Sequence, residues 1–177
     1  MDLSKLTSNI PDKDKSFPPV EKWNPDLCPD VAFNIDRDGN WYYQNSIIGK
    51  NNLKILFSKI LKYENNNYYC VTPVEKVLVK VDIAPYMIID YLIQDDKYLF
   101  ITNLDYSFEL LKDAVVELIS INDHEVIPIF NVRNNIKGFL SRNVYYQLLN
   151  EVIDHNVDGN KVFILSDNQR FNIGIIE

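Results

Sequence analysis

Alternation of apolar and polar residues runs through most of this chain and predicts short β-strands joined by tight turns. Residues 74–81 show it most clearly, because valine occupies every second position from Val77 to Val81. Side chains alternate between the two faces of a strand, so these valines share one face. Pro73 cannot donate a hydrogen bond to a neighbouring strand, and it indicates a bulge, an edge or a bend at that point.

The same alternation predicts hairpins in both halves of the chain. In the first hairpin, Asp38-Gly39-Asn40 forms the reversal, because glycine supplies the positive φ that a tight turn requires. The predicted strands cover residues 33–37 and 41–44, 68–72 and 74–81, 86–94 and 97–102, 125–133, and 161–165 and 170–176.

Helical spacing of apolar residues occurs in two segments. Residues 53–63 carry apolar side chains three and four positions apart, and Asn51 or Asn52 is the predicted cap. Residues 140–153 repeat this spacing. Residues 110–121 fit a helix by their spacing and a strand by their β-branched content, so both interpretations stay open.

These elements predict an α+β fold with mostly antiparallel sheet, organised as two small lobes. We expect the lobes at residues 17–85 and 86–177, after a flexible N-terminal tail of residues 1–16 that shows no periodicity. A strand, a helix and a hairpin follow one another in both halves. This order suggests structural repeats, although the residue identities do not match.

Charge distinguishes the two halves. The 177 residues include 18 Lys and Arg against 25 Asp and Glu, a net charge of −7, and the whole excess falls in residues 86–177. Nucleic-acid binding requires clustered cations and is not expected. The acidic second half is interpreted either as a docking surface for a basic protein or as a surface that serves solubility.

The predictions about cellular location, cofactors and metals are based mainly on sequence motifs that do not occur. No apolar run follows the first charged residues, and no segment reaches the roughly 20 apolar residues of a membrane helix, so we expect a cytoplasmic protein. Cys28 and Cys70 are too few for a disulfide framework or a zinc site. The segment from Asn34 to Trp41 imitates the start of a calcium loop, but Asn45 replaces the bidentate Glu. We expect no metal and no cofactor.

Several motifs resemble the bacterial domain of unknown function family 1285 over residues 19–85 in order and spacing. They are Pro19-Val20-Glu21-Lys22-Trp23-Asn24-Pro25, Ile35-x-Arg37-Asp38-Gly39-x-Trp41-x-Tyr43, Ile47-Ile48-Gly49-Lys50, Leu56-Phe57-Ser58, Val71-Thr72-Pro73-Val74-Glu75-Lys76-Val77, Asp82-x-Ala84-Pro85 and, more weakly, Leu140-x-Arg142-x-Val144-Tyr145-Tyr146-x-Leu148. The resemblance implies a small cytosolic bacterial protein with an α+β fold of related repeats. It also implies a suggested signalling or ligand-binding role and no catalytic residue to carry over.

Five residues are candidates for ligand binding: Arg37, Trp41, Thr72, Glu75 and Lys76. Arg37 beside Trp41 could hold an anion or a planar ligand. The polar groups around Pro73 are interpreted either as the mouth of a cleft or as a solvated edge strand. Glu75 and Lys76 are adjacent, so they cannot pair along a straight strand.

Aromatic residues give one further expectation. Trp23 precedes the first hairpin and is expected either to lie across Trp41 and fix the N-terminal arm, or to leave an aromatic wall open to a partner.

No catalytic set is expected, because no spacing pairs His124 or His155 with Cys70. We therefore expect a non-enzymatic small-ligand-binding, signalling or regulatory module with a cleft between its two lobes. The alternative is an enzyme that uses Glu75 as general acid or base on an anionic small molecule. The partner, a small molecule or a protein, and homo-oligomerisation are left open.

Overall fold

The structure is a computed structural model that describes residues 7–8, 10, 17–122 and 125–176. The chain forms two compact units, Met1–Pro85 and Tyr86–Glu177. The predicted flexible tail and His124 lie largely or wholly outside the described residues. Within these residues, no helix is long and apolar enough to cross a membrane.

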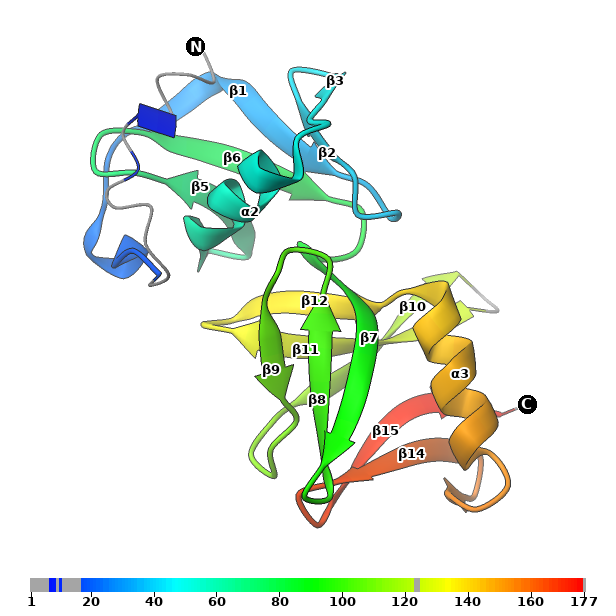
Figure 1. The fold of residues 1–177 in the computed structure, drawn as a ribbon. Helices are drawn as coiled ribbons and strands as arrows, with labels where there is room; N and C mark the ends of the chain where they lie inside the picture. The colour runs from blue at the N-terminus through cyan, green and yellow to red at the C-terminus, as the bar shows by residue number, and fades with distance from the viewer. Residues whose placement is uncertain (1–6, 9, 11–16, 123–124, 177) are drawn as a thin grey trace. The chain divides into compact units, whose positions relative to one another are not determined.

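The first unit contains a six-stranded sheet in the order β3-β2-β1-β6-β5-β4 (Figure 1). Strands β1 to β3 form one antiparallel meander, and strands β4 to β6 form a second. Parallel pairing between β1 and β6 joins the two meanders. The strands are β1 (Leu27–Ile35), β2 (Trp41–Tyr43), β3 (Ser46–Ile47), β4 (Leu61–Glu64), β5 (Asn67–Val71) and β6 (Lys76–Val81).

The second unit contains a six-stranded sheet in the order β10-β11-β12-β7-β8-β9. Here β7 and β12 form the parallel pair between two antiparallel meanders. The strands are β7 (Tyr86–Gln94), β8 (Lys97–Thr102), β9 (Ser107–Glu109), β10 (Val116–Asn122), β11 (Glu125–Arg133) and β12 (Ile136–Leu140).

The two sheets therefore have the same topology, in which the first and last strands pair in parallel at the centre. The predicted α+β class and the structural repeats are confirmed. The corresponding segments differ from those predicted, however. The hairpin of β5 and β6 belongs to a six-stranded sheet, whereas the hairpin near the C-terminus, β14 (Lys161–Ser166) and β15 (Gln169–Ile175), belongs to a separate three-stranded sheet with β13 (Val157–Asp158).

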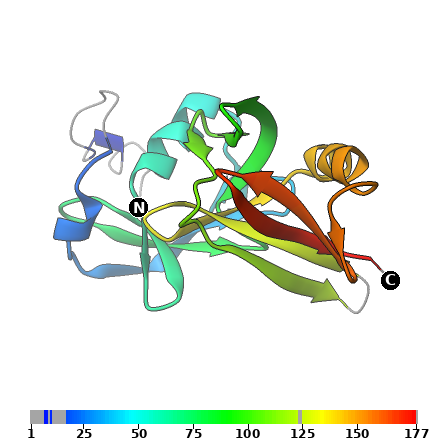
Figure 2. The same cartoon turned by 90° about the horizontal axis from the view of Figure 1, so that it is seen from below.

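Helices cover one face of each sheet. Helix α2 (Asn51–Lys59) places Phe57 against Phe33, with 4.9 Å between the ring centroids. Helix α3 (Arg142–Val152) begins where the Ser141 side chain accepts a hydrogen bond from the Val144 amide. It packs against β7, β12 and β14. Figure 2 shows the orange and red β14–β15 hairpin lying across the yellow-green strands of the second sheet.

Among the described residues, five two-residue hairpin turns use consecutive left-handed residues, the geometry of type I′ turns. Asn and Asp tolerate this conformation better than other non-glycine residues, because their short side chains bond to the local backbone. The pairs are Gln44-Asn45, Asn65-Asn66, Asp95-Asp96, Asn134-Asn135 and Asp167-Asn168.

Most predicted elements are confirmed, but strands β3, β4, β9, β12 and β13 were not predicted. The predicted helix over 53–63 ends at Lys59, because Leu61 and its neighbours pair with β5. Residues 110–121 are not helical; β10 occupies their second half. Strand β12 was not predicted, because this short segment contains Gly138, a residue that strands disfavour.

Gly138 in β12 provides a stability test. A Cβ atom there would lie 2.6 Å from Val132 Cγ2 and 3.2 Å from Tyr86 Cβ. We expect Gly138→Ala to lower the free energy of unfolding by about 1–3 kcal/mol through overpacking. Gly49→Ala is the matched control, since a Cβ there meets no atom within 4 Å. Chemical denaturation measures both, and equal stability of the two variants would contradict the close packing at Gly138.

Candidate functional site

The structure distributes the five predicted ligand-binding residues over three different settings of the first unit. Trp41 is in the core and has no exposed surface. Its ring meets Phe33 edge-on at 6.1 Å, on the same face of the sheet as Phe57. The indole Nε1 has no hydrogen-bond partner within the described residues. Trp41 is therefore part of the scaffold, and a ligand could touch it only if the core opened.

Thr72 organises the turn that contains Pro73. The buried Thr72 hydroxyl accepts hydrogen bonds from the amides of Val74, at 3.4 Å, and Glu75, at 3.1 Å. The Thr72 amide donates to the Glu75 carbonyl at 2.8 Å. This turn separates β5 from β6, so the bend predicted at Pro73 is confirmed and Thr72 serves it structurally.

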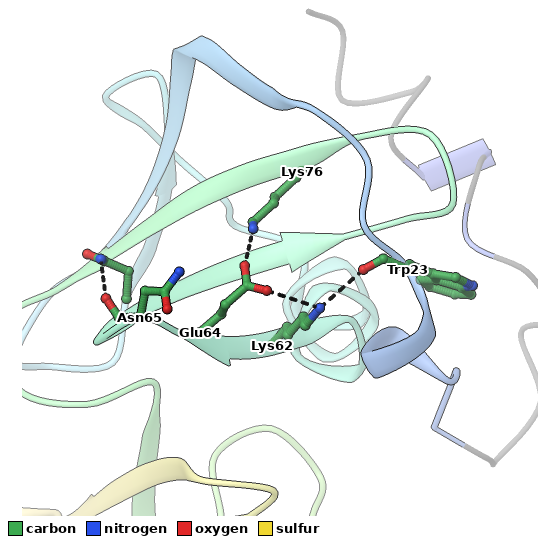
Figure 3. Close-up of polar contacts among 6 residues, drawn as sticks. Trp23, Lys62, Glu64, Asn65 and Lys76 are labelled. Carbon is green, nitrogen blue, oxygen red and sulfur yellow. Dashed lines mark hydrogen bonds and ion pairs between the residues drawn. The ribbon is translucent and has the colours of Figure 1, made fainter.

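Lys76 forms an ion pair with Glu64 (Figure 3). It forms none with its neighbour Glu75. Its ammonium group also lies 4.4 Å from the centroid of the Tyr69 ring. The second oxygen of Glu64 lies 3.5 Å from the Lys62 ammonium. One carboxylate therefore holds two lysines together, and we call Lys62, Glu64 and Lys76 the lysine bridge.

The lysine bridge also holds the N-terminal arm. Lys62, only 7% exposed, donates a hydrogen bond to the Trp23 carbonyl at 3.1 Å (Figure 3). Strand pairing places Lys62 on the face of the sheet opposite Trp41. The arm is thus fixed through the Trp23 backbone, and the expected packing of Trp23 across Trp41 is wrong.

Glu75 is half-buried, and its Oε2 atom is buried without a hydrogen-bond partner in the described part of the chain. The sequence leaves open whether Glu75 and Lys76 meet in one cleft or have different neighbours. Lys76 bonds to Glu64, so Glu75 and Lys76 do not pair with each other.

Arg37 lies at the other end of β6. Its amide donates to Asp82 Oδ2 at 3.1 Å, just beyond the last residue of that strand. At about 3.3 Å per residue, β6 separates this point from Lys76 by about 20 Å. Arg37 therefore does not share a binding site with Glu75 and Lys76.

A shallow hollow of about 360 Å³ lies at the Arg37 end, and we call it the β1–β2 hollow. Most of its lining residues have polar side chains, and they come from β1, β2 and the segments that follow β1, β2 and β6. The lining residues are Asn34, Ile35, Asp36, Tyr42, Asn45 and Asp82.

Asp36 fixes the shape of this hollow. Its Oδ1 accepts from the amides of Asp38, at 2.9 Å, and Asn40, at 2.8 Å. Its Oδ2 accepts from the Asn40 side chain at 3.1 Å and the Tyr42 hydroxyl at 3.0 Å. Partial burial alone would raise the pKa of Asp36, but these hydrogen bonds outweigh it and lower the pKa. Four bonds occupy the carboxylate, so Asp36 orders the loop and does not act as a calcium ligand.

Asp82 keeps one carboxylate oxygen uncommitted. Its Oδ2 accepts from the Arg37 amide, whereas Oδ1 has no protein partner in the described chain. The side chains of Asn34 and Asn45 likewise make no hydrogen bond to another described residue. Sequence reasoning did not single out these three residues as candidates, although Asp82 lies in a family motif and Asn34 in the calcium-like segment.

Comparisons with known proteins agree with this fold. Residues 18–84 match the family described as "Domain of unknown function (DUF1285), N-terminal domain". A solved DUF1285 family protein from Silicibacter pomeroyi is 28% identical, with a TM-score of 0.86, over 99% of this chain and 96% of that chain. One from Shewanella baltica is 27% identical, with a TM-score of 0.54, over 67% of this chain and 91% of that chain. No curated protein matches. The predicted resemblance to the family is confirmed.

Thr72 provides a test of the turn. Thr72→Val keeps the side-chain shape and removes the hydroxyl, so the amides of Val74 and Glu75 lose their acceptor. We expect the free energy of unfolding to fall by about 1–3 kcal/mol. Thr72→Ser, which keeps the hydroxyl, is the control in the same denaturant titration. A Thr72→Val protein as stable as the Ser variant would argue against this role of the hydroxyl.

Glu64 provides a pH test. The hydrogen bond from Lys76 lowers the pKa of Glu64 below its ordinary value of 4.5, against an opposing effect of burial. The ionised carboxylate therefore stabilises the fold above pH 4.5, and this stabilisation is lost as the pH falls through the lowered pKa. We expect Glu64→Gln to be less stable than the parent at pH 7 and to lose less stability between about pH 5 and pH 3.

The control for the pH test is Glu21→Gln, which changes an exposed carboxylate in the 3₁₀ helix η1 (Val20–Lys22). Thermal melts across the pH range measure all three proteins. Parallel pH profiles for the parent and Glu64→Gln would show that the lysine bridge does not contribute.

Proposed function

We propose that this protein, whose residues 18–84 match the DUF1285 N-terminal domain, is a non-enzymatic module that binds a small polar molecule in the β1–β2 hollow. On this proposal the protein acts in the cytoplasm, as a ligand-responsive signalling or regulatory component. A cleft between the two lobes stays a prediction of the sequence.

The observation that supports the proposal most directly is that the carboxylates of Asp36 and Asp82 differ in how many of their oxygens are hydrogen-bonded within the protein. Asp36 is fully occupied by loop hydrogen bonds, which hold the hollow in one shape before any ligand arrives. The Arg37 amide donates to Oδ2 of Asp82, and Oδ1 of Asp82 remains available to accept a hydrogen bond from a ligand. A preorganised wall with uncommitted polar groups is what a small-ligand site requires.

The predicted residues take different parts in this proposal. Arg37 is exposed, and its amide bonds to Asp82, which lines the hollow. Trp41 lies in the core beneath the strands that form the hollow, and Thr72 with Lys76 stabilises the opposite end of β6. Arg37 is the predicted residue best placed to touch the ligand.

A thermal-shift screen of metabolites and nucleotides on the full chain tests the proposal. A true ligand should raise the melting temperature of the parent, and Asp82→Asn and Asn34→Ala should reduce the shift to less than half. An Asn side chain at position 82 can still accept from the Arg37 amide, so the loop should remain folded.

Two control variants test whether a stabilising ligand binds in the β1–β2 hollow. Asp30→Asn changes an exposed carboxylate on β1 outside the hollow, and Lys50→Ala changes the lining of a separate hollow beside α2. Both should respond like the parent. No stabilising ligand in the screen, or equal losses in the controls and the hollow variants, would contradict the proposal.

An enzyme that uses Glu75 as general acid or base is the second candidate. Its support is the buried, unpartnered Oε2 atom of a half-buried carboxylate, a setting found in catalytic acids. A substrate for such an enzyme should be turned over by the parent and not by Glu75→Gln. Turnover that survives Glu75→Gln would remove this candidate, and docking of a basic protein on the acidic second half stays a prediction.

A further inference from the structure

We infer that the N-terminal arm, residues 18–23, is a strap that opens while the first unit stays folded, and that Lys62 is the latch that holds it closed. Helix η1 of the arm lies against β4, the strand at one edge of the first sheet. An open arm therefore uncovers this strand together with the Lys62 ammonium group. The inference concerns a conformational change and is independent of the ligand proposed for the β1–β2 hollow.

The backbone of the arm contributes little to holding it in place. The amides of Val20, Lys22 and Trp23 donate to carbonyl groups two or three residues earlier, inside the arm itself. Within the described residues, no backbone hydrogen bond joins residues 18–23 to a strand. Segments with few tertiary hydrogen bonds open at a lower free energy than the core of the same domain. The arm therefore meets the physical requirement for local opening.

Two side chains anchor the arm to the first unit. Val20 is 3% exposed, whereas the other five residues of the arm are half-buried or exposed. The second anchor is the hydrogen bond from the Lys62 ammonium group to the Trp23 carbonyl at 3.1 Å. These anchors are three residues apart in the chain, so the release of one weakens the hold on the other.

Lys62 acts as the latch because its ammonium group is nearly buried and shares its carboxylate. Its nitrogen lies 3.5 Å from Glu64, which also bonds to Lys76, so the Trp23 carbonyl is the closer acceptor (Figure 3). A buried ammonium group that loses an acceptor pays a large desolvation cost. This cost favours the closed arm, and it disappears when opening exposes Lys62 to water.

Opening changes which part of the first sheet other molecules can reach. The unpaired backbone groups of an edge strand pair readily with another chain. Strand β3 at the other edge has two residues, whereas β4 has four. The strap thus controls access to the longer of the two edge strands of this sheet.

Two reactive groups in the full chain distinguish opening of the arm from unfolding of the unit. The Lys62 amine, 7% exposed, should be acetylated by acetic anhydride through the open arm. The Cys70 thiol has no exposed surface and faces Phe57 in the core, so iodoacetamide should reach it only when the sheet unfolds. Mass spectrometry of peptides measures both rates, and the exposed Lys50 amine gives the rate of unhindered acetylation.

Val20→Ala tests the strap by weakening the first anchor. We expect Lys62 to be acetylated about tenfold faster than in the parent, because reaction through a rapid opening follows the open population. The alkylation rate of Cys70 should not change. Val74→Ala, at a site that is 62% exposed, is the control and should leave both rates unchanged. An unchanged rate at Lys62, or equal acceleration at Lys62 and Cys70, would overturn the strap.

Lys62→Met tests the latch, because it keeps the apolar stem and removes the donor to Trp23. We expect trypsin to cleave after Lys22 at least about tenfold faster, the effect of losing one hydrogen bond from a charged group. Lys76→Met removes the other lysine that bonds to Glu64 and has no bond to the arm, so cleavage should match the parent. Equal cleavage in the parent and Lys62→Met, or equal acceleration in the two variants, would overturn the role of Lys62.

Discussion

Parallel pairing between the first and last strands of each sheet is the constraint on which the rest of this structure depends. In the first unit it brings Asp82 beside residues more than 40 positions earlier in the chain. The Asp82 amide donates to the Ile35 carbonyl, and the Asp82 carboxylate accepts from the Arg37 amide. The walls of the hollow thus come from two different meanders. In the second unit the same pairing joins the Ser141 amide to the Ile88 carbonyl, at the point where α3 begins.

Elements determined by neighbouring residues could be predicted from the sequence. The hairpins around Gly39 and Asp95-Asp96 follow from turn residues and strand alternation, which are local signals. Strand β4 and strand β12 could not be predicted in this way. Leu61 continues the apolar spacing of α2, and only its pairing with Cys70 of β5 determines that it is extended. Tertiary pairing overrides local propensity at such positions.

The candidate site was harder to predict than the fold, because residue type does not reveal a partner. Lys76 is a binding candidate in the sequence because it stands next to Glu75. Its ion-pair partner, however, is Glu64, which lies two strands away in the sheet. Trp41 lies in a family motif, and its alternation with Tyr42 already indicates that one of the two rings points inward. Asp82 gains its significance only when β6 lies beside β1. The geometry of the candidate site therefore could not be predicted, because it depends on contacts between residues far apart in the sequence.

The two-residue turns have a consequence for the order of folding. Hairpins with favourable turns form in about 1–10 μs, because they close short loops. The parallel pairs must close much longer loops, and contacts of large sequence separation slow folding. Each sheet should therefore assemble as two fast meanders that dock slowly, and the hollow, whose walls belong to different meanders, should be among the last features of the first unit to form.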